Sequence, residues 1–466
     1  MTFKKLDGTD INYFSGILGP EYVLTNQDDL AKNAKDYTED LCYFPEVVLK
    51  PNTTAEVASI LTYCNSQNIC VTPRGAGTGL SGGSLPIMGG VSLSMERFNN
   101  IIEIDERNFQ VHVEPGVINE ALQNVLKEKE LFYPPDPASK GSCFLGGNVA
   151  HSSGGPRAVK YGTTRDYVLN LEVVLANGDI IETGANTLKF STGYNLTQLM
   201  IGSEGTLGVV TKMVLKVLPL PKNTLLLFAP FASPEKACEA VSGIFRAGAN
   251  PSACEFIEPD GFRLAANLLN ISFPIAEEIG AYLLIEVDGN DYTAMMQECE
   301  TISEVLYNHQ AIDVLFAETA AQKEYYWKLR RSIGEATKHN NTYKEEDTVV
   351  PRAELPELFK GVKEIASRYG FRTVCYGHAG DGNLHVNILK DQLSDDFWNH
   401  EINLAIIEIF ELCKKLKGTI SGEHGIGLVQ QKYMPIVMPA HQLQLMKNIK
   451  AAFDPKGILN PGKIFN

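Results

Sequence analysis

The spacing of hydrophobic residues along the chain predicts short helices and strands in alternation. Residues 55–65 place apolar side chains three or four positions apart, which is typical of a helix with one buried face, and residues 69–72 follow as a strand. Further strands are predicted where β-branched residues are frequent, at 91–95, 109–113, 169–175 and 209–218. The first half of the chain is therefore expected to mix helices with many strands.

Two prolines within residues 218–223 mark a boundary, because they end a long strand and the glycine clusters of the first half stop there. Beyond this boundary the pattern predicts helices at 233–247, 292–309, 317–338 and 396–417, and strands at 224–229, 282–288, 371–376 and 384–389. We therefore predict an α+β protein with domains at 1–222 and 223–420, and a C-terminal segment, 421–466, that returns to the first domain.

Many of the 40 glycines are concentrated at 75–90, 141–162, 202–208, 377–382 and 418–427. The first cluster contains Gly77, Gly79 and Gly82 in the spacing of a dinucleotide-binding fingerprint, with Glu96 about twenty residues further on. That fingerprint must open a helix, whereas residues 80–90 contain four glycines and a proline and cannot form one. We interpret the segment instead as a loop whose amide groups form an anion-binding nest.

The balance of charges restricts the classes of partner. The chain has 56 acidic side chains against 41 lysines and arginines, a formal net charge of -15, so most of its surface repels phosphate backbones and anionic lipids. Binding to nucleic acid is therefore not expected. The N-terminus lacks the apolar stretch of a signal peptide, and no window of about 18 residues suits a membrane helix, which predicts a cytoplasmic protein.

Three glycine-rich segments, 73–83, 146–162 and 202–208, resemble the FAD-binding segments of the vanillyl-alcohol-oxidase superfamily. Together with residues 378–385 and 421–427 they resemble its D-2-hydroxy-acid dehydrogenase branch, which includes D-lactate dehydrogenases, the flavin subunit of glycolate oxidase and D-2-hydroxyglutarate dehydrogenases. The resemblance implies a two-lobed flavin-binding domain of the PCMH type at 1–222. It also implies a substrate or cap domain, built on an antiparallel sheet with flanking helices, at 223–420.

The resemblance also implies which residues bind FAD. They are Arg74, Gly75, Ala76, Gly77, Thr78, Gly79, Asp136, Gly146, Gly147, Asn148, Ser153, Gly154, Tyr161, Gly162, Glu204, Gly208, Val209 and Asn460. Members of the superfamily with covalently bound flavin carry a histidine in the first loop. Thr78 stands near that position here, so noncovalent FAD is expected.

Two histidines, His378 and His385, flank a glycine turn. Gly380 and Gly382 exclude a helix between them, and the turn redirects the chain so that the two imidazoles can converge. In the strand that follows, His385 and Asn387 are expected on one face. Two imidazoles with a carboxylate suit zinc, manganese or iron with positions open for a substrate.

By resemblance, His378, His385 and Glu423 are the ligands of a divalent metal, His424 is the general base, and Asn387 is a polar contact to the substrate. Two other residues in glycine-rich motifs are interpreted differently. Asp381 is expected to form the turn. His151 fits a hydrogen bond to the cofactor as well as it fits a catalytic role.

A 2-hydroxy acid also needs a cation for its carboxylate. The predicted helix over 317–338 carries Arg330 and Arg331, and a guanidinium group recognises carboxylates through two parallel hydrogen bonds. By resemblance Arg330 is the better candidate, with Lys344 as an assistant, whereas Arg331 and Lys344 fit a solvated face equally well. Part of the branch has a threonine where Gly334 falls, which argues against a larger dicarboxylic substrate.

The expected reaction is oxidation of a small D-2-hydroxy acid, with D-lactate or glycolate favoured, by hydride transfer to the flavin. The alternatives are a D-2-hydroxyglutarate dehydrogenase, a non-redox enzyme like alkyl-glycerone-phosphate synthase, and a catalytically inactive partner subunit. The nine cysteines show no Cys-x-x-Cys pair and no iron–sulfur spacing, so electrons are expected to leave for an external acceptor. An electron-transfer flavoprotein, an iron–sulfur subunit and a quinone are all suitable acceptors.

The sequence is also compatible with a homodimer, and with contact to the inner face of a membrane through a partner.

Overall fold

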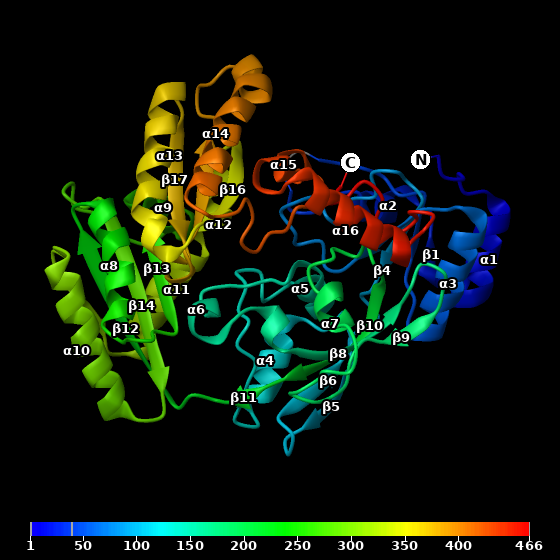
Figure 1. Ribbon diagram of the computed structural model, residues 1–466, viewed down its shortest axis with the longest axis horizontal. Helices are drawn as coiled ribbons and strands as arrows, with labels where there is room; N and C mark the ends of the chain where they lie inside the picture. Colours follow the sequence, from blue (N-terminus) through cyan, green and yellow to red (C-terminus); the bar gives the residue numbers. More distant parts are fainter. Residues whose placement is uncertain (1, 39–40, 466) are drawn as a thin grey trace. The chain divides into compact units, whose positions relative to one another are not determined.

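The computed structural model of the protein describes residues 2–38 and 41–465 (Figure 1). The chain divides into two compact units, and each is described by itself. The first comprises Met1–Gly154, Thr163–Leu220 and Glu423–Asn466, and the second comprises Gly155–Gly162 and Pro221–Gly422. Within the described residues, no helix has both the length and the apolar character needed to cross a membrane.

The first unit contains a four-stranded sheet with a helical layer. Its strand order is β1 (Val23–Leu24), β2 (Val47–Leu49), β4 (Val91–Ser94) and β3 (Val71–Arg74), with β2, β4 and β3 parallel. Helices α1 (Gly8–Leu18) and α3 (Thr54–Gln67) contribute to the buried core of this sheet. A capping box formed by Thr53 and Glu56 begins α3, and Asn68, with φ of 57°, ends it.

A second, antiparallel sheet of the first unit joins segments that are distant in sequence. Its order is β5 (Ile101–Asp105), β6 (Gln110–Val113), β10 (Val209–Lys216), β8 (Val168–Val174) and β9 (Ile180–Glu182). The alternation of β-branched residues predicted β6, β8 and β10. Two short strands, β7 (Leu131–Phe132) and β11 (Leu218–Pro219), form a separate antiparallel pair.

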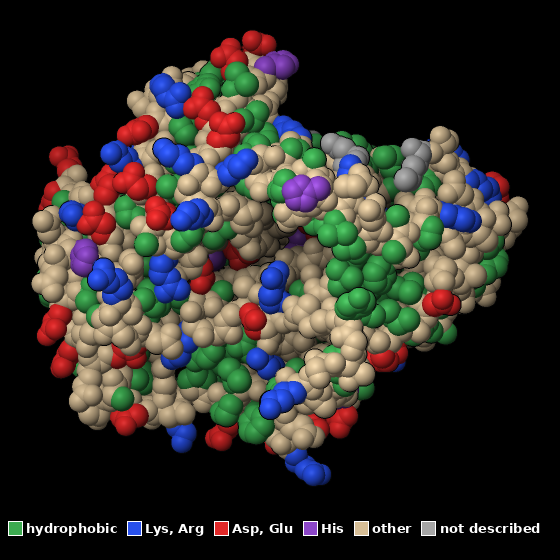
Figure 2. Space-filling view, viewed as in Figure 1, with side chains coloured by type: hydrophobic (Ala, Val, Ile, Leu, Met, Phe, Trp, Pro, Cys, Tyr) green, Lys and Arg blue, Asp and Glu red, His purple; other side chains and the backbone are tan. Residues whose placement is uncertain are grey.

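The C-terminal segment packs on the first unit. The amide of Asn460 donates to the carbonyl of Val71, and the amide of Val71 donates to the carbonyl of Ile458. The segment therefore pairs with the edge strand β3. No residue of helix α16 (Ala440–Phe453) is buried, and Leu445 is 60% exposed. Figure 2 shows hydrophobic side chains gathered on the surface along this helix.

The second unit is built on one seven-stranded antiparallel sheet. Its order is β15 (Leu315–Ala317), β12 (Asn223–Phe231), β14 (Ala281–Gly289), β13 (Ala253–Ile257), β17 (Arg372–Gly377), β18 (Asn383–Leu389) and β16 (Tyr343–Val349). Helices α8 (Pro234–Arg246), α10 (Tyr292–Asn308), α13 (Leu355–Tyr369) and α14 (Ile402–Lys415) pack on one another. Helices α9 (Pro259–Leu269), α11 (Ala320–Arg331) and α12 (Ile333–Asn340) form another group, which shares a core with β12, β13 and β14.

Two local predictions need correction. The long helix expected over 317–338 is two helices, α11 and α12, because the chain breaks at Ser332. The helix expected over 396–417 opens with a wide π-helical turn, Phe397–Glu401, before α14. The glycine-rich segment 141–162 contains a short helix, α5 (Leu145–His151). The structure also adds β13, α9, β16 and α13, which the pattern of apolar residues did not single out.

Candidate active site

The loop after β3 presents a row of free amide groups. Within the described part of the chain, the N–H groups of residues 75–79 donate no hydrogen bond. Five successive donors among small residues form a concave nest that suits an anion. The guanidinium of Arg74 lies against this loop, since a Cβ atom built on Gly77 would overlap it. It is buried and donates to the carbonyl of Lys35 at 2.7 Å. Burial lowers the pKa of Arg74, although the group stays cationic at neutral pH.

Several glycine-rich segments of the first unit converge on this loop. A Cβ atom built on Gly75 would lie 3.7 Å from the amide nitrogen of Gly147 in α5, and one built on Gly83 would lie 3.2 Å from the His151 ring. The side-chain amide of Asn460 donates to the carbonyls of Gly83 at 2.8 Å and Glu204 at 2.7 Å. Residues far apart in sequence therefore lie against Gly75 and Gly83, on either side of the free amides.

The turn that carries His424 is fixed to the same loop. The carboxylate of Glu204 accepts from the amides of Ile426 at 2.8 Å and Gly427 at 2.7 Å. The Ser81 hydroxyl donates to the carbonyl of His424 at 3.1 Å. Glu204 was expected among the cofactor-binding residues. Its carboxylate instead holds the turn that carries His424, the expected general base.

The other expected cofactor residues divide between the units. In the first unit, Asp136 pairs with Lys140 at 3.0 Å, and the side-chain nitrogen of Asn148 is buried without a partner. Gly146 and Gly147 lie in α5, Ser153 and Gly154 follow it, Gly208 packs against Val173, and Val209 begins β10. Tyr161 and Gly162 belong to the second unit. There the Tyr161 hydroxyl donates to Asp288 at 2.8 Å.

In the second unit, His378 directly follows β17, begins the turn to β18 and is buried. Its Nδ1 atom lies 2.8 and 3.0 Å from the two carboxylate oxygens of Glu255 on β13. Since a ring nitrogen that donates to a carboxylate carries the proton, the lone pair of the neutral imidazole lies on Nε2. The two rings of His378 and His385 are 5.5 Å apart, so the glycine turn does bring them together as predicted.

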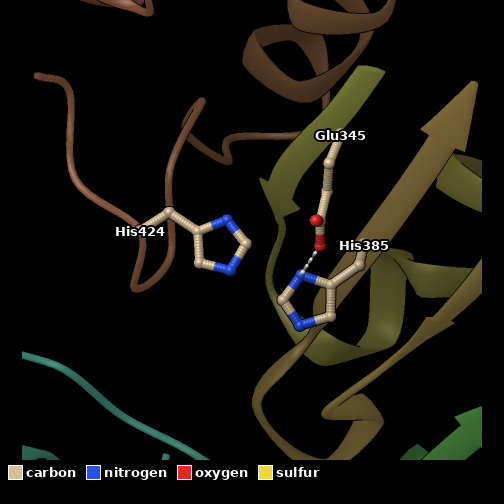
Figure 3. A group of neighbouring side chains, drawn as sticks. All are labelled: Glu345, His385 and His424. Atoms are coloured by element: carbon tan, nitrogen blue, oxygen red, sulfur yellow. Dashed lines mark ion pairs between the residues drawn. The ribbon is translucent and has the colours of Figure 1, made fainter. Parts of the chain in front are cut away.

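His385 lies on β18 opposite two acidic residues of β16. Its Nδ1 atom is 3.5 Å from Glu345 and 3.7 Å from Asp347. Figure 3 shows the ion pair between Glu345 and His385 as a dashed line. The other oxygen of Asp347 accepts from the amide of Gly422 at 2.8 Å. Glu423 and His424 are the next residues along the chain, so this bond fixes the point from which they leave the second unit.

Three acids near the histidines were not predicted from the sequence: Glu255, Glu345 and Asp347. Glu345 and Asp347 alternate on a strand, a signal that could have placed them on one face. Glu255 gave one weaker signal, since it is a lone acid within the apolar stretch 253–257.

Arg330 is buried on α11, with an exposed fraction of 5%. Its guanidinium pairs with Glu255 at 2.5 Å and lies 4.9 Å from the centre of the Tyr376 ring, while its Nε atom has no partner. Arg331, in contrast, places its guanidinium 5.0 Å from the Trp327 ring. The two adjacent arginines thus lie in different surroundings, and Arg330, which the resemblance favours, is the one that pairs with a buried carboxylate.

The remaining expected residues of this unit lie on β16, β18 and α12. Asn387 is fully buried, donates to the carbonyl of Val374 at 3.3 Å, and leaves its side-chain oxygen without a partner. The ammonium group of Lys344 lies 5.1 Å from the Trp398 ring. A Cβ atom on Gly334 would approach the Tyr376 hydroxyl at 3.1 Å, so a larger residue there would crowd Tyr376.

Burial and charge act in opposite directions on the acid at the centre of this group. Burial raises the pKa of Glu255, but Arg330 and His378 together hold it below its ordinary value. Glu255 is therefore a carboxylate at neutral pH. Burial raises the pKa of Tyr376 well above its usual range, so its hydroxyl keeps its proton and can donate.

The expected site residues are thus assembled in two sets. His378, His385, Asn387, Lys344 and Arg330 belong to the second unit. Glu423 and His424 belong to the first, where a Cβ atom on Gly154 would lie 3.0 Å from the Glu423 carboxylate. One set combines imidazoles with a buried cation, and the other belongs to a turn held by Ser81 and Glu204.

Two family descriptions match the chain. Residues 220–464 match "FAD linked oxidases, C-terminal domain", and residues 45–184 match "FAD binding domain". The chain is 38% identical to the glycolate oxidase subunit GlcD of Bacillus subtilis, over 96% of this chain and 95% of that protein. It is 40% identical to a D-lactate dehydrogenase of Anaerostipes hadrus, over 90% and 89% of the two chains. It is 34% identical to the mitochondrial D-2-hydroxyglutarate dehydrogenase of Danio rerio, over 99% and 86%.

Solved structures share the fold. A p-cresol methylhydroxylase with substrate bound superposes with a TM-score of 0.80, covering 99% of this chain and 98% of that one at 18% identity. An alkyldihydroxyacetonephosphate synthase superposes with a TM-score of 0.74 over 99% and 86%, also at 18% identity. At such low identity the likeness concerns the fold alone, and it confirms the predicted PCMH-type architecture.

Proposed function

The chain belongs to the FAD-linked oxidase family, in the vanillyl-alcohol-oxidase superfamily, and on this premise we propose that it oxidises a small D-2-hydroxy acid to the 2-oxo acid. As an FAD-linked oxidoreductase it has D-lactate, glycolate and D-2-hydroxyglutarate enzymes among its relatives. We favour D-lactate or glycolate. The observation that carries the choice of an anionic substrate is the buried guanidinium of Arg330, whose Nε atom has no partner.

The residues of the first unit fit a noncovalent FAD. The free amides of residues 75–79 suit its pyrophosphate, and the unpartnered side-chain nitrogen of Asn148 supplies a further buried donor. Asn460 and Glu204 contribute by holding the segments around this loop together. The remaining residues of the expected set stay part of this proposal.

The residues of the second unit fit a divalent metal. His378 offers Nε2 because Glu255 takes its Nδ1 proton, and His385 lies on the neighbouring strand. We propose Glu423 as the third ligand, since it directly follows Gly422, which Asp347 anchors beside His385. A divalent ion held there would supply a Lewis acid that lowers the pKa of the substrate hydroxyl, and FAD would supply the acceptor for the hydride. Zinc, manganese and iron all suit these ligands.

The protein's own groups then bind the substrate and move one proton. Arg330 binds the substrate carboxylate. The free side-chain oxygen of Asn387 accepts a hydrogen bond from a hydroxyl group of the substrate. Lys344 adds positive charge from β16. His424 accepts the hydroxyl proton, a task that suits a neutral imidazole near pH 7.

A larger dicarboxylic acid is the second candidate substrate, because a D-2-hydroxyglutarate dehydrogenase is 34% identical to the chain. Gly334 argues against it, since a glycine offers no hydroxyl to a second carboxylate beside Tyr376. The non-redox synthase chemistry has weaker support, because the likeness to that enzyme is one of fold at 18% identity.

We propose that the electrons go to a separate protein or a quinone. Relatives from Bacillus subtilis and Escherichia coli are named as subunits of glycolate oxidase, which supports an electron-accepting partner such as an iron–sulfur subunit or an electron-transfer flavoprotein. All nine cysteines are unpaired, and those at 64, 70, 143, 238, 254, 299, 375 and 413 are buried, without the spacing of a cluster site.

The experiment that tests the proposal is anaerobic bleaching of the bound flavin. D-Lactate, glycolate and D-2-hydroxyglutarate are each added to the FAD-loaded protein, and the loss of flavin absorbance is followed. Bleaching by D-lactate or glycolate at lower concentration than by D-2-hydroxyglutarate is expected. A flavin that none of the three acids reduces would contradict the proposed reaction and leave the synthase chemistry as the better alternative.

His424→Ala is the matching variant. It is expected to retain FAD but to lose at least about 100-fold in the rate of bleaching, the usual contribution of a general base. Removal of metal by a chelator is the second control. A chelated, folded protein that is bleached at the original rate would remove the metal from the proposal while leaving the flavin chemistry intact.

A further inference from the structure

Glu255 is the one acid in the apolar strand β13, and its side chain is fully buried. Phe256 pairs with Gly377 and Ile257 with Tyr376, so the register brings Glu255 opposite His378. Since side chains alternate across a strand, Glu255 shares its face with Ala253 and Ile257, which pack in the core formed with α9, α11 and α12. Arg330 reaches Glu255 from α11 on this same face.

The carboxylate of Glu255 contacts two groups with different tasks. His378 Nδ1 lies 2.8 Å from one oxygen, and Arg330 lies 2.5 Å from the other. The first contact selects the imidazole tautomer that presents Nε2, and it fixes the orientation of the ring. The second holds the guanidinium in one place and leaves Nε free for another acceptor.

Stability alone is a poor reason for such an arrangement. Replacing a buried ion pair by apolar residues of similar volume is often neutral or stabilising, because both charges must give up their water. A carboxylate that touches a proposed metal ligand and a proposed substrate-binding cation is better explained by positioning.

We propose that Glu255 is a positioning residue that couples the metal ligand His378 to the carboxylate-binding Arg330. This inference rests on the proposed function, and it deepens that function by linking the two halves of substrate recognition. Metal affinity and substrate affinity should then depend on one buried side chain that touches neither the metal nor the substrate.

The test compares Glu255→Gln with Glu258→Gln. Glu258 is a matched control, because its carboxylate is also mostly buried, accepts from Lys363 at 2.8 Å and from the amide of Cys375 at 2.6 Å, and contacts neither His378 nor Arg330. Two quantities are measured on FAD-loaded, chelator-treated protein. One is the dissociation constant for Zn²⁺, and the other is the D-lactate concentration that gives half-maximal flavin bleaching after Zn²⁺ is restored.

Glu255→Gln is expected to weaken Zn²⁺ binding by roughly 10- to 100-fold, the usual effect of losing a carboxylate behind a ligating histidine. It should also raise the half-saturating D-lactate concentration, whereas Glu258→Gln should change neither quantity by more than about twofold. Wild-type values of both quantities in a folded Glu255→Gln variant would overturn the inference.

A double variant separates positioning from a failure to fold. Glu255→Gln combined with Arg330→Met removes the uncompensated buried cation that the single change leaves behind. Zn²⁺ binding should remain weak in this charge-balanced variant, and recovery of wild-type Zn²⁺ affinity would overturn the role of Glu255 toward His378. A wild-type protein that binds no Zn²⁺ would overturn the proposed metal site and this inference with it. That outcome is recognisable because it appears before any variant is compared.

Discussion

At the scale of single residues, the site depends on buried polar groups whose partners are already defined. Arg330 and Arg331 are adjacent in sequence, but one pairs with a buried carboxylate and the other lies over an indole ring. Glu204 holds the His424 turn through two backbone amides. The role of each side chain therefore follows from what it contacts rather than from its type.

The two arginines provide a matched pair of variants. Arg330→Lys keeps the charge but loses the fork that binds a carboxylate through two hydrogen bonds, so KM for the hydroxy acid should rise roughly 10- to 100-fold. Arg331→Lys should leave KM within about twofold, because its guanidinium faces Trp327. Steady-state kinetics with an artificial electron acceptor measure both. Equal changes in the two variants would contradict the assignment of Arg330.

Lys463 gives a prediction about pH. Its ammonium group is buried and donates to the carbonyl of Leu85 at 2.5 Å, and burial lowers its pKa to about 8 from an ordinary value of 10.5. Between these two values the unfolded chain holds more protons than the folded one, so the free energy of unfolding should rise with pH. Relative to Lys463→Met, the wild type should gain up to about 3 kcal/mol across this range.

Urea unfolding of both proteins at pH 7.5 and pH 10 measures this gain, and the comparison cancels the titration of all other groups. If the difference in the free energy of unfolding between the two proteins stays constant, or falls toward high pH, the pKa of Lys463 is not lowered by burial.

At the scale of elements, short turns place the functional side chains on their strands. The turn between His378 and β18 ends at Gly382, whose φ is +75°. A Cβ atom there would overlap the carbonyl oxygen of Val350 and lie 3.1 Å from the amide nitrogen of Arg352. The close approach of two backbone segments, rather than flexibility, therefore requires glycine at this position.

Gly370 offers a control for this turn. It ends α13 with a φ of +76°, nearly that of Gly382, but no atom lies within 4 Å of the position of its Cβ. Gly370→Ala should cost about 1 kcal/mol of stability, the strain of a left-handed backbone. Gly382→Ala should cost about 3 kcal/mol or more, because backbone atoms must also move. Denaturant unfolding of both variants checks the difference, and equal costs would mean that the turn has room for a side chain.

At the scale of the whole molecule, the chain passes between its two units repeatedly. The boundaries fall at residues 154/155, 162/163, 220/221 and 422/423. Residues 155–162, within the segment that matches the FAD-binding domain, are held by the second unit through Lys160 and Tyr161, which both contact Asp288. Neither unit is therefore a continuous stretch of sequence.

A truncated chain should show this dependence. A fragment of residues 1–220 lacks Asn460 and Lys450, which contact Gly83 and Thr206 of the first unit. We expect the fragment to lose FAD on gel filtration, as measured by the ratio of flavin to protein absorbance. Co-expression with residues 221–466 should restore retention. A fragment that keeps stoichiometric FAD by itself would show that the C-terminal segment is dispensable for the cofactor loop.

Most of the strands and several helices could be predicted from the sequence, because alternation and helical spacing are local properties of the chain. The helix α3 and the strands β6, β8, β10, β12 and β14 lie close to their predicted positions. The break between α11 and α12 could not be predicted, since both helices present apolar residues to one core and the interruption at Ser332 leaves that pattern intact. Strand β16 was missed because its charged residues are unusual in a strand.

The sequence by itself determined the family, the flavin loops and the histidines that flank a glycine turn, because these depend on residue types at short spacing. Only the tertiary structure decided which groups surround them. Glu255, Glu345 and Asp347 come from strands distant in sequence from the histidines, and long-range strand pairing brings them to His378 and His385. It also decided that Arg330, and not Arg331, lies buried against a carboxylate, since burial depends on the packing of α11 on the sheet.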